Sequence, residues 1–515
     1  MDDSTITFVV LGATVVLFVV DRLPVAVVAV LVALSLWATG VLSLEGALAG
    51  FGDPAVLFIA SLFVVSEALE AAGVTAWVGQ ALLERVGESR LRLLVYTLGL
   101  VAVLTALINV NGSVAALVPV AVVLAVRTGR SPSQLMLPLA FSAHAGSLLA
   151  LTGTPVNVIV AEAAPNGFGY FEFALVGLPL TLCTVAVVVL FGERLLPERT
   201  PRSIAPDFSG HARTLIAQYE LDHPEGTLMN RRKGVAEVLI PPRSELIGDR
   251  VFAGMITPSG DLAVLAVRRG GDEIGATELE EGDTLLLQGS WDALDRNLGD
   301  PEVLVVDAPD VVRRQAVPLG AGAKRALVVL AAMVVLLATG AVPPAVAGLL
   351  AASAMIVLRV LSVEQAQRGI SWTTVVLVGG MMSLSAAMVA SGAAEQLADG
   401  LVSIVGDLGP RWLLLGVFVL TAVLGQLISN MATALIVIPV ALSAAAEMGV
   451  APEPVLMAVT VSAAASFLTP VATPANLMVM EPGGYRFGDY WKLGLPLLVL
   501  FGLVAVLLVP VFWSF

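Results

Sequence analysis

The stretch SNMATALIVIPV at residues 429–440, followed by PVATPAN at residues 470–476, decides how this chain folds. Both segments place small polar residues and prolines inside otherwise apolar sequence. Unsatisfied backbone groups are expensive in a bilayer, so an interrupted helix survives there only where it is buried in protein or lines a cavity. Two such interruptions close together in the chain indicate a binding site at the depth of the membrane.

The same pattern occurs earlier in the chain. Pro119 in the first half corresponds to Pro439 in the second, and TPVN at residues 154–157 corresponds to TPAN at residues 473–476. Two further pairs of identical residues, Ser66 with Ser385 and Gly73 with Gly392, have the same offset in numbering as the TPxN motifs. The offset for the two prolines differs from it by a single position. So regular a spacing predicts an internal repeat, the architecture on which many transporters are built.

The composition is that of a polytopic membrane protein. Of the 515 residues, 57% are hydrophobic and only 13% are charged, and the mean hydropathy is +0.93; soluble domains carry about 25% charged residues. The net charge of −14 argues against nucleic acid as a partner. The single cysteine, Cys183, excludes an internal disulfide and gives no support to a thiolate metal site.

The apolar runs and the repeat together predict an α-helical membrane protein with two inverted repeats, each of five spans and a re-entrant hairpin. The first repeat is expected at residues 1–196 with its hairpin near 90–127, and the second at residues 317–515 with its hairpin near 410–446. Each long apolar run that carries a TPxN motif is expected to be one helix unwound at the motif, because proline blocks helix continuation.

Residues 197–316 differ from the rest of the chain. They hold 21 acidic and 13 basic side chains. Short β-rich runs at 237–240, 262–267 and 284–288 alternate with turn signals, which predicts a small α+β domain.

The distribution of charged residues predicts the orientation of the chain in the membrane. In the first half, arginines cluster at alternate ends of the spans, while the opposite ends carry acidic residues and no Lys or Arg. By the positive-inside rule the arginine ends are cytoplasmic. Residues 197–316 are therefore expected in the cytoplasm and both termini outside, in the cell's inner (plasma) membrane.

The motifs SNMATALIVIPV, GTPVN and ATPAN resemble those of the divalent anion/sodium symporter (DASS) family of the ion transporter superfamily. The insert resembles a TrkA C-terminal (RCK-C) domain with its core at about 230–310, through VLIPPRSELIG, LAVLAVRRGG and EEGDTLLLQG. The resemblance implies a homodimer with an elevator motion, sodium as the coupling ion, and a small regulatory ligand on the insert. In that family a Ser-Asn-Thr hairpin tip and the unwound TPxN segment build the sodium and anion sites.

Carried onto this sequence, the resemblance implies two overlapping sets of residues. The anion would contact Asn109, Asn111, Ser113, Thr154, Pro155, Ser429, Asn430, Met431, Thr473 and Pro474. Sodium would contact Asn109, Asn111, Gly153, Asn157, Ser429, Asn430, Ala472 and Asn476. Met431 stands where the family has Thr, and the first tip reads NVNGS at 109–113; both departures bear on dicarboxylate specificity and on the first sodium site.

The residues themselves fit an anion site, since hydroxyls, amides, helix N-termini and bound sodium can meet anion charge without a basic side chain. The alternative role for the asparagines is to join helices by hydrogen bonds. His144, in an apolar run, is expected to serve packing or a helix contact rather than a proton relay.

These observations favour a sodium-coupled importer of a small divalent anion, embedded in membrane lipid, with sulfate ahead of C4-dicarboxylates. A Na⁺/H⁺ antiporter or a metalloid-oxyanion exporter of the same superfamily is the alternative among transporters, although the spans carry no Asp at a predicted midplane for proton coupling. A transceptor, which binds the anion and signals through the insert, is the alternative from another class. The sequence contains nothing that resembles an enzyme's catalytic set.

Overall fold

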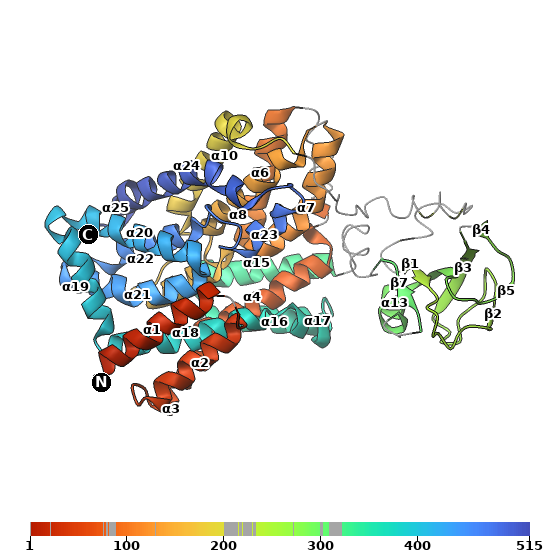
Figure 1. The fold of residues 1–515 in the computed structure, drawn as a ribbon, viewed down its shortest axis with the longest axis horizontal. Coiled ribbons are helices and arrows are strands. Elements are labelled where there is room, and N and C mark those ends of the chain that lie inside the picture. Colours follow the sequence, from red (N-terminus) through yellow and green to blue (C-terminus); the bar gives the residue numbers. More distant parts are fainter. Residues whose placement is uncertain are drawn as a thin grey trace. The chain divides into compact units, whose positions relative to one another are not determined.

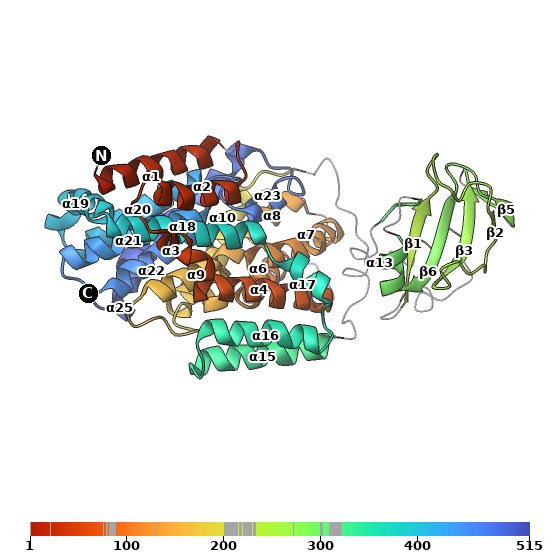
Figure 2. The ribbon, with the colours of Figure 1, turned by 90° about the horizontal axis from the view of Figure 1, so that it is seen from below.

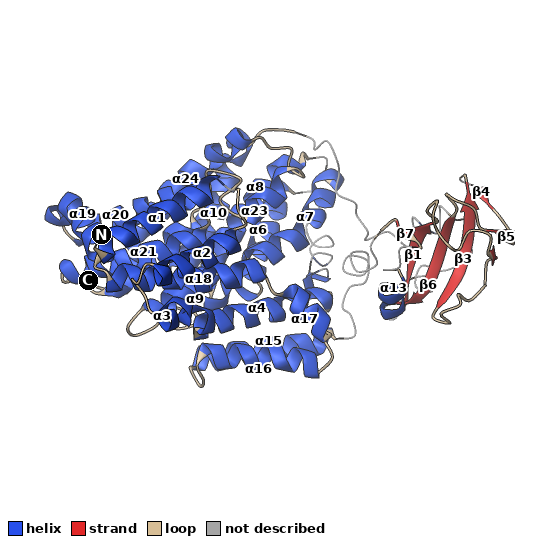
Figure 3. Ribbon diagram, turned by 60° about the horizontal axis from the view of Figure 1, so that its bottom comes forward, coloured by secondary structure: helices blue, strands red, loops and turns tan. Residues whose placement is uncertain are grey.

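The computed structural model describes residues 2–20, 22–75, 77–78, 81, 89–128, 130–199, 215, 219, 229, 233–270, 272–298, 302–307 and 322–515. The chain forms two compact units. The membrane unit consists of Met1–Ala68, Leu82–Ala205 and Leu327–Phe515, and the insert unit consists of Leu69–Ala81 and Pro206–Ala326. The membrane unit is helical, and the described strands all belong to the insert unit (Figure 3).

The first half of the membrane part is a succession of apolar helices (Figure 1). In order they are α1 (Asp3–Val20), α2 (Val25–Ala38), α3 (Leu44–Ala49), η1 (Gly50–Gly52), α4 (Pro54–Ala71), α6 (Arg90–Leu107), α7 (Val110–Arg127), η2 (Pro132–Gln134), α8 (Met136–Gly146), η3 (Ser147–Leu149), η4 (Leu151–Gly153), α9 (Pro155–Ala163) and α10 (Ala174–Leu195).

The second half repeats this order. Its elements are α15 (Ala323–Thr339), α16 (Pro344–Val357), α17 (Val363–Gly369), α18 (Trp372–Ala390), α19 (Ala393–Val405), η6 (Gly406–Leu408), α20 (Pro410–Leu427), α21 (Asn430–Glu447), α22 (Pro452–Ala464), α23 (Pro474–Met480), η7 (Phe487–Asp489), α24 (Tyr490–Leu503), the π-helical turn η8 (Val504–Leu508) and α25 (Val509–Phe512). Corresponding helices, from α1 with α15 to α10 with α24, begin at nearly the same offset along the chain, which confirms the repeat.

Individual contacts also repeat. The Ser142 hydroxyl donates to the Leu98 carbonyl at 2.9 Å, and at the equivalent place in the second half the Ser462 hydroxyl donates to the Phe418 carbonyl at 2.7 Å. The matched glycines at positions 73 and 392 both adopt positive φ, 72° and 76°. The same side-chain and backbone geometry therefore recurs in both halves.

The two halves contact each other reciprocally. Helix α7 packs against α23, as α21 packs against α9, and α8 packs against α23, as α22 packs against α9. Reciprocal contacts of this kind define a pseudo-two-fold relation between the repeats. With the odd number of spans predicted for each repeat, such a relation corresponds to a second repeat that is inverted in the membrane.

Small residues allow other helices of the membrane unit to approach closely. Helix α2 lies along α18 (Figure 2), where a Cβ atom on Gly380 would stand 2.5 Å from the carbonyl oxygen of Ala29. Close backbone approach at small residues is the usual basis of helix association in lipid. Eight of the described helical segments are long and apolar enough to cross a membrane, as expected for a polytopic protein.

The insert unit contains an antiparallel sheet in the order β4-β3-β6-β1-β7. Its strands are β1 (Lys233–Leu239), β3 (Leu262–Arg269), β4 (Asp272–Glu273), β6 (Thr284–Ser290) and β7 (Leu304–Val305), with a separate β2 (Arg250–Val251) and β5 (Thr277–Glu278) pair and the helix α13 (Trp291–Asn297). The three β-rich runs expected from the sequence lie in β1, β3 and β6, and they are the three adjacent central strands.

Some expectations lie outside the described residues, and some elements were not expected. The linkers at 200–214 and 308–321, parts of the predicted RCK-C-like core, and the segment 82–88 are not among the described residues. The short helices α3, α17 and α19 were missed by the sequence analysis. The sequence of α19 does carry an amphipathic pattern, with acidic residues and alanines each repeating four positions apart. In the structure Glu395 and Asp399 are exposed, while Ala394 and Ala398 are buried.

Candidate functional site

Both TPxN motifs interrupt a helix, as the sequence predicted. We call residues 147–154 the first break and residues 465–473 the second break; they separate α8 from α9 and α22 from α23. Pro155 and Pro474 are the first residues of the helices that follow. Proline suits that position because its missing N–H would be unpaired there anyway.

One asparagine supports each break. Asn157 Nδ2 donates to the carbonyls of Ser147 at 2.8 Å and Ala150 at 2.9 Å. Asn476 Nδ2 donates to the carbonyls of Ser466 at 2.7 Å and Thr469 at 3.0 Å. The acceptors lie 10 and 7 residues before the asparagine in both repeats. Each amide thus satisfies carbonyls that the interrupted helix leaves free.

A glycine on a neighbouring helix lets each break pack against it. Gly177 of α10 faces the first break, where a Cβ atom would overlap the carbonyl group of Leu148. Gly494 of α24 faces the second break, where a Cβ atom would stand 2.8 Å from the carbonyl carbon of Phe467. Both breaks are therefore held between their own asparagine and the backbone of a neighbouring helix.

The threonines of the two motifs cap the helices that follow. The Thr154 hydroxyl accepts from the N–H of Val156 at 3.4 Å, and the Thr473 hydroxyl accepts from the N–H of Asn476 at 3.3 Å. Gly153 and Ala472, which the resemblance implied as sodium contacts, are buried in the breaks. These contacts place the motif residues together, and the predicted roles in ion binding stay predictions.

The first hairpin tip is built around Asn109, which lies between α6 and α7. Its Oδ1 accepts from the N–H of Gly112 at 2.8 Å, and its Nδ2 donates to Ser66 Oγ at 2.9 Å. The buried Ser113 hydroxyl donates to the Asn109 carbonyl at 2.7 Å. Asn111 is exposed on the first turn of α7. Asn109 therefore caps α7 and also joins two helices, the alternative role considered for it.

At the second tip Ser429 occupies the matching cap position, and its hydroxyl accepts from the N–H of Ala432 at 3.3 Å. Asn430 and Met431 follow it, half-buried, on the first turn of α21. The sequence analysis missed Gln426, which links this hairpin to the second break. Its Nε2 donates to the Ala465 carbonyl at 3.4 Å, and its Oε1 accepts from the N–H of Leu468 at 3.0 Å.

The first hairpin is joined to its own break by a different residue. The Thr152 hydroxyl donates to the Ala106 carbonyl at the end of α6, at 2.8 Å, and contacts the Tyr170 hydroxyl at the same distance. In both repeats the hairpin and the break therefore form one connected group. The reciprocal packing of α7 with α23 and of α21 with α9 then brings the two groups together.

His144 connects the repeats more directly than the sequence analysis expected. Its Nε2 lies 3.1 Å from Thr473 Oγ1 and 3.3 Å from Asn476 Oδ1, both in the other repeat. The side chain is 2% exposed. The expected helix contact is present, but its partners are two residues of the candidate site. An ionisable residue shortly before Thr152, close to a break, was the only signal in the sequence.

Several buried polar atoms of the site have no hydrogen-bond partner within the described part of the chain. They include Asn157 Oδ1 and the hydroxyls of Thr105, Thr433 and Thr469. We call such buried atoms open. No charged side chain occurs in the tips or breaks, at residues 106–113, 147–157, 426–433 and 465–476. An open amide oxygen is a hard ligand that suits sodium, and open hydroxyls can donate to an anion.

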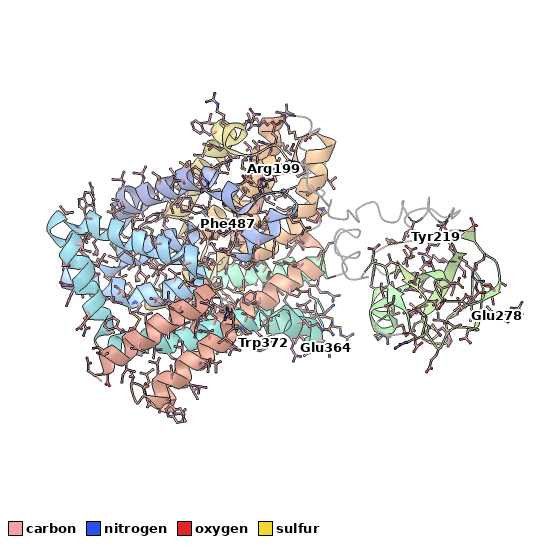
Figure 4. All side chains as sticks on the ribbon, viewed as in Figure 1. Arg199, Tyr219, Glu278, Glu364, Trp372 and Phe487 are labelled. Atoms are coloured by element: carbon pink, nitrogen blue, oxygen red, sulfur yellow. The ribbon has the colours of Figure 1, made fainter. Side chains whose placement is uncertain are left out.

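In the insert unit the two arginines that end β3 already have partners. Arg269 forms a bidentate ion pair with buried Asp283, at 2.7 Å and 2.8 Å. Arg268 lies over the ring of Tyr219, and Tyr219 is labelled in Figure 4. The hydrogen bond from Arg269 holds the pKa of the Asp283 carboxyl below its usual value. Burial raises the pKa of the Tyr219 hydroxyl, which donates to Glu237 at 2.6 Å. These contacts favour a structural role for the arginines over direct binding of an anionic regulator.

Comparison with known proteins points to one class of protein, the transporters. The profile of the citrate transporter family (CitMHS) matches residues 15–462 and, in a second match, 345–515. The chain is 29% identical to the uncharacterized transporter YfbS of Escherichia coli (strain K12), over 98% of both chains. It is 28% identical to a putative sulfur deprivation response regulator of Chlamydomonas reinhardtii, over 91% of this chain and 94% of that protein.

The likeness to a third relative is more limited. The chain is 24% identical to sodium/sulfate cotransporter 2 of Chlamydomonas reinhardtii, over 56% of this chain and 34% of that protein. The matched class is a transporter and not an enzyme, as the sequence indicated. Since the family profile covers nearly the whole membrane part, the chain belongs to the citrate transporter (CitMHS) family.

Proposed function

We propose that this transporter is a sodium-coupled importer of a small divalent anion, with sulfate ahead of C4-dicarboxylates. The anion would bind between the two tips and the two breaks, and sodium would bind the oxygen atoms of the same segments. The insert would lie in the cytoplasm and carry the regulatory ligand. The two repeats would move the site across the membrane by an elevator motion within a homodimer.

The observation that carries the proposal is the pair of breaks, each supported by an asparagine at the same spacing. An interrupted helix within a membrane exposes backbone groups, and the ends of half-helices carry partial charges that bind ions. Open hydroxyls and an open amide oxygen lie at this place, and the tips and breaks contain no arginine or lysine. An anion bound there would need a cation beside it, which is the physical reason to expect sodium coupling.

The relatives support the choice of substrate. One is named a sodium/sulfate cotransporter and another a sulfur deprivation response regulator. The family description names citrate, which is larger and carries a third carboxyl group. We rank sulfate first because the site lacks arginine or lysine, the residues that would pair with the carboxylates of a larger anion.

Uptake by the purified full-length chain in proteoliposomes tests the proposal. Radiolabelled sulfate should accumulate when a sodium gradient is imposed and not when choline replaces sodium, and unlabelled succinate and citrate should compete less well than sulfate. Asn157→Ala should abolish accumulation, whereas Asn166→Ala, at an exposed asparagine outside the site, should not. Accumulation that is equal in sodium and in choline would refute the coupling.

A transceptor is the second candidate, favoured by the relative that is named a response regulator and matches along nearly the whole chain. It would bind labelled sulfate in detergent with sodium present, yet show no accumulation in proteoliposomes. Binding and uptake measured on the same preparation therefore separate the two functions.

A further inference from the structure

In both breaks the asparagine nitrogen donates to two carbonyls of the break, but the group that faces the asparagine oxygen differs. Asn476 Oδ1 lies 3.3 Å from His144 Nε2. Asn157 Oδ1 is fully buried and has no hydrogen-bond partner among the residues that the structure describes. The repeat is therefore symmetric in its backbone and asymmetric at one polar contact.

The hydrogen bonds settle which atoms face each other in the second break. Asn476 Nδ2 donates to two carbonyl oxygens, of Ser466 and Thr469, which can only accept. The remaining amide atom, Oδ1, is the one that faces the imidazole, so His144 Nε2 must carry the hydrogen. The Thr473 hydroxyl at 3.1 Å shares this N–H.

The difference between the breaks originates at one position of the repeat. The offset that relates the two TPxN motifs carries His144 onto Ala463, whose methyl side chain cannot donate a hydrogen bond. Helix α22, which carries it, packs against α9 as α8 packs against α23. The oxygen of Asn476 therefore receives an N–H from the other repeat, while the oxygen of Asn157 receives none from the described residues.

We propose that sodium, as a co-transported substrate, binds at the first break only, with Asn157 Oδ1 as a ligand. In the second break the Nε2–H of His144 takes the place that a second sodium ion would occupy. This inference rests on the sodium coupling proposed above and assigns it a single sodium site. Ser429, Asn430, Ala472 and Asn476 would then serve the anion or the backbone of the break.

The chemistry of the open atoms supports this division. An amide oxygen only accepts, so when it is buried without a donor it is satisfied by a cation or a water molecule. An N–H group aimed at the same oxygen repels a cation. The open hydroxyls, of Thr105 in the first repeat and of Thr433 and Thr469 in the second, can donate as well as accept, so each can be satisfied by an anion or a water molecule and none of them requires a cation.

Binding of radiolabelled sodium to the full-length chain in detergent, counted per protomer, tests the inference without any transport. The wild type should bind one ion. Asn157→Ala should lose it, and Asn476→Ala, which loses the same two carbonyl contacts, should keep it. This pair separates the role of the amide oxygen from that of the amide nitrogen.

Substitutions at His144 and Ala463 test the inference independently, again by the number of sodium ions bound. His144→Ala makes both repeats alike at this position and should bind two ions, with a Hill coefficient that rises above about 1 if the sites are coupled. His144→Gln retains an N–H donor and should still bind one. Ala463→His leaves the contacts of Asn157 Nδ2 unchanged and should bind none.

The outcomes distinguish this inference from the function on which it rests. A wild type that binds no sodium would overturn the coupling and the inference together. A wild type that binds two ions, or one ion lost in Asn476→Ala and kept in Asn157→Ala, would overturn the inference and leave the coupling standing. If Asn157→Ala does not fold, judged by gel filtration, a folded His144→Ala that binds only one ion refutes the proposal.

Discussion

Gly177 provides the most direct test of how the first break is held in place. With alanine at this position of α10, the new Cβ atom would stand 2.9 Å from the Cβ atom of Leu148 and overlap its carbonyl group. Carbon atoms in contact prefer about 3.5–4.0 Å. The two backbones would have to separate by more than about 0.6 Å, taking the difference between these distances.

The cost can be estimated from the atoms that obstruct the new methyl group. Overpacking of a well-filled interior costs about 1–3 kcal/mol, and the upper end applies because the obstruction is backbone and cannot change rotamer. Gly99, inside α6, is the matched control, since no atom lies within 4 Å of a Cβ built there. Alanine there should stabilise the helix by about 0.5–1 kcal/mol. Gly177 also lies inside a helix, so this gain applies to both variants, and we expect them to differ by the overpacking cost alone, about 1–3 kcal/mol.

Thermal unfolding of both variants in the same detergent measures this difference, and sodium binding measures its consequence for the site. Gly177→Ala should unfold at a lower temperature than the wild type and bind sodium more weakly, because Leu148 lies between two of the residues that contact Asn157. Gly99→Ala should unfold at the same or a higher temperature and bind normally. Equal unfolding temperatures for the two variants would refute the account of the close approach.

Three further predictions concern other parts of the chain. Arg359 has a positive φ of 54° at the position equivalent to Gly40, so Arg359→Gly should raise the free energy of unfolding by about 1 kcal/mol. Leu358→Gly, at an ordinary φ of −77°, should lower it; a lower unfolding temperature for Arg359→Gly would contradict the assignment of strain. In the insert, the pKa of Asp283 is lowered from 3.8 by Arg269, so the ion pair stabilises the fold above pH 3.8 and loses that effect as the pH falls through the lowered value. Asp283→Asn should increase hydrogen exchange in β6 at neutral pH and remove this acid dependence, and unchanged exchange would show that the pair contributes nothing. In a Cys183→Ser background, Ser259→Cys on the exposed turn after β2 should react with an impermeant thiol reagent only after cells are permeabilised, whereas Asn166→Cys should react in intact cells; the reverse pattern would overturn the proposed orientation.

Much of the fold follows from the sequence, because the features that specify it are local. Pro155 and Pro474 each start a new helix, since proline cannot continue the preceding one. Identical residues at a constant offset predicted the repeat, and short β-rich runs between turn signals predicted the three central strands of the insert. The amphipathic helix α19 was not predicted, because it is neither apolar enough to be a span nor marked by a proline.

Tertiary structure decided which residues of the site act together. His144 and Asn476 are 332 residues apart, and no pattern in the sequence connects them. The close approach of Gly177 to Leu148 depends likewise on how α10 lies against the first break. The two asparagines look equivalent in the TPxN motifs, yet one oxygen is paired and the other is open. That difference arises because α8 carries a histidine against α23, where α22 carries only an alanine against α9, and a contact between distant helices exists only once the chain has packed.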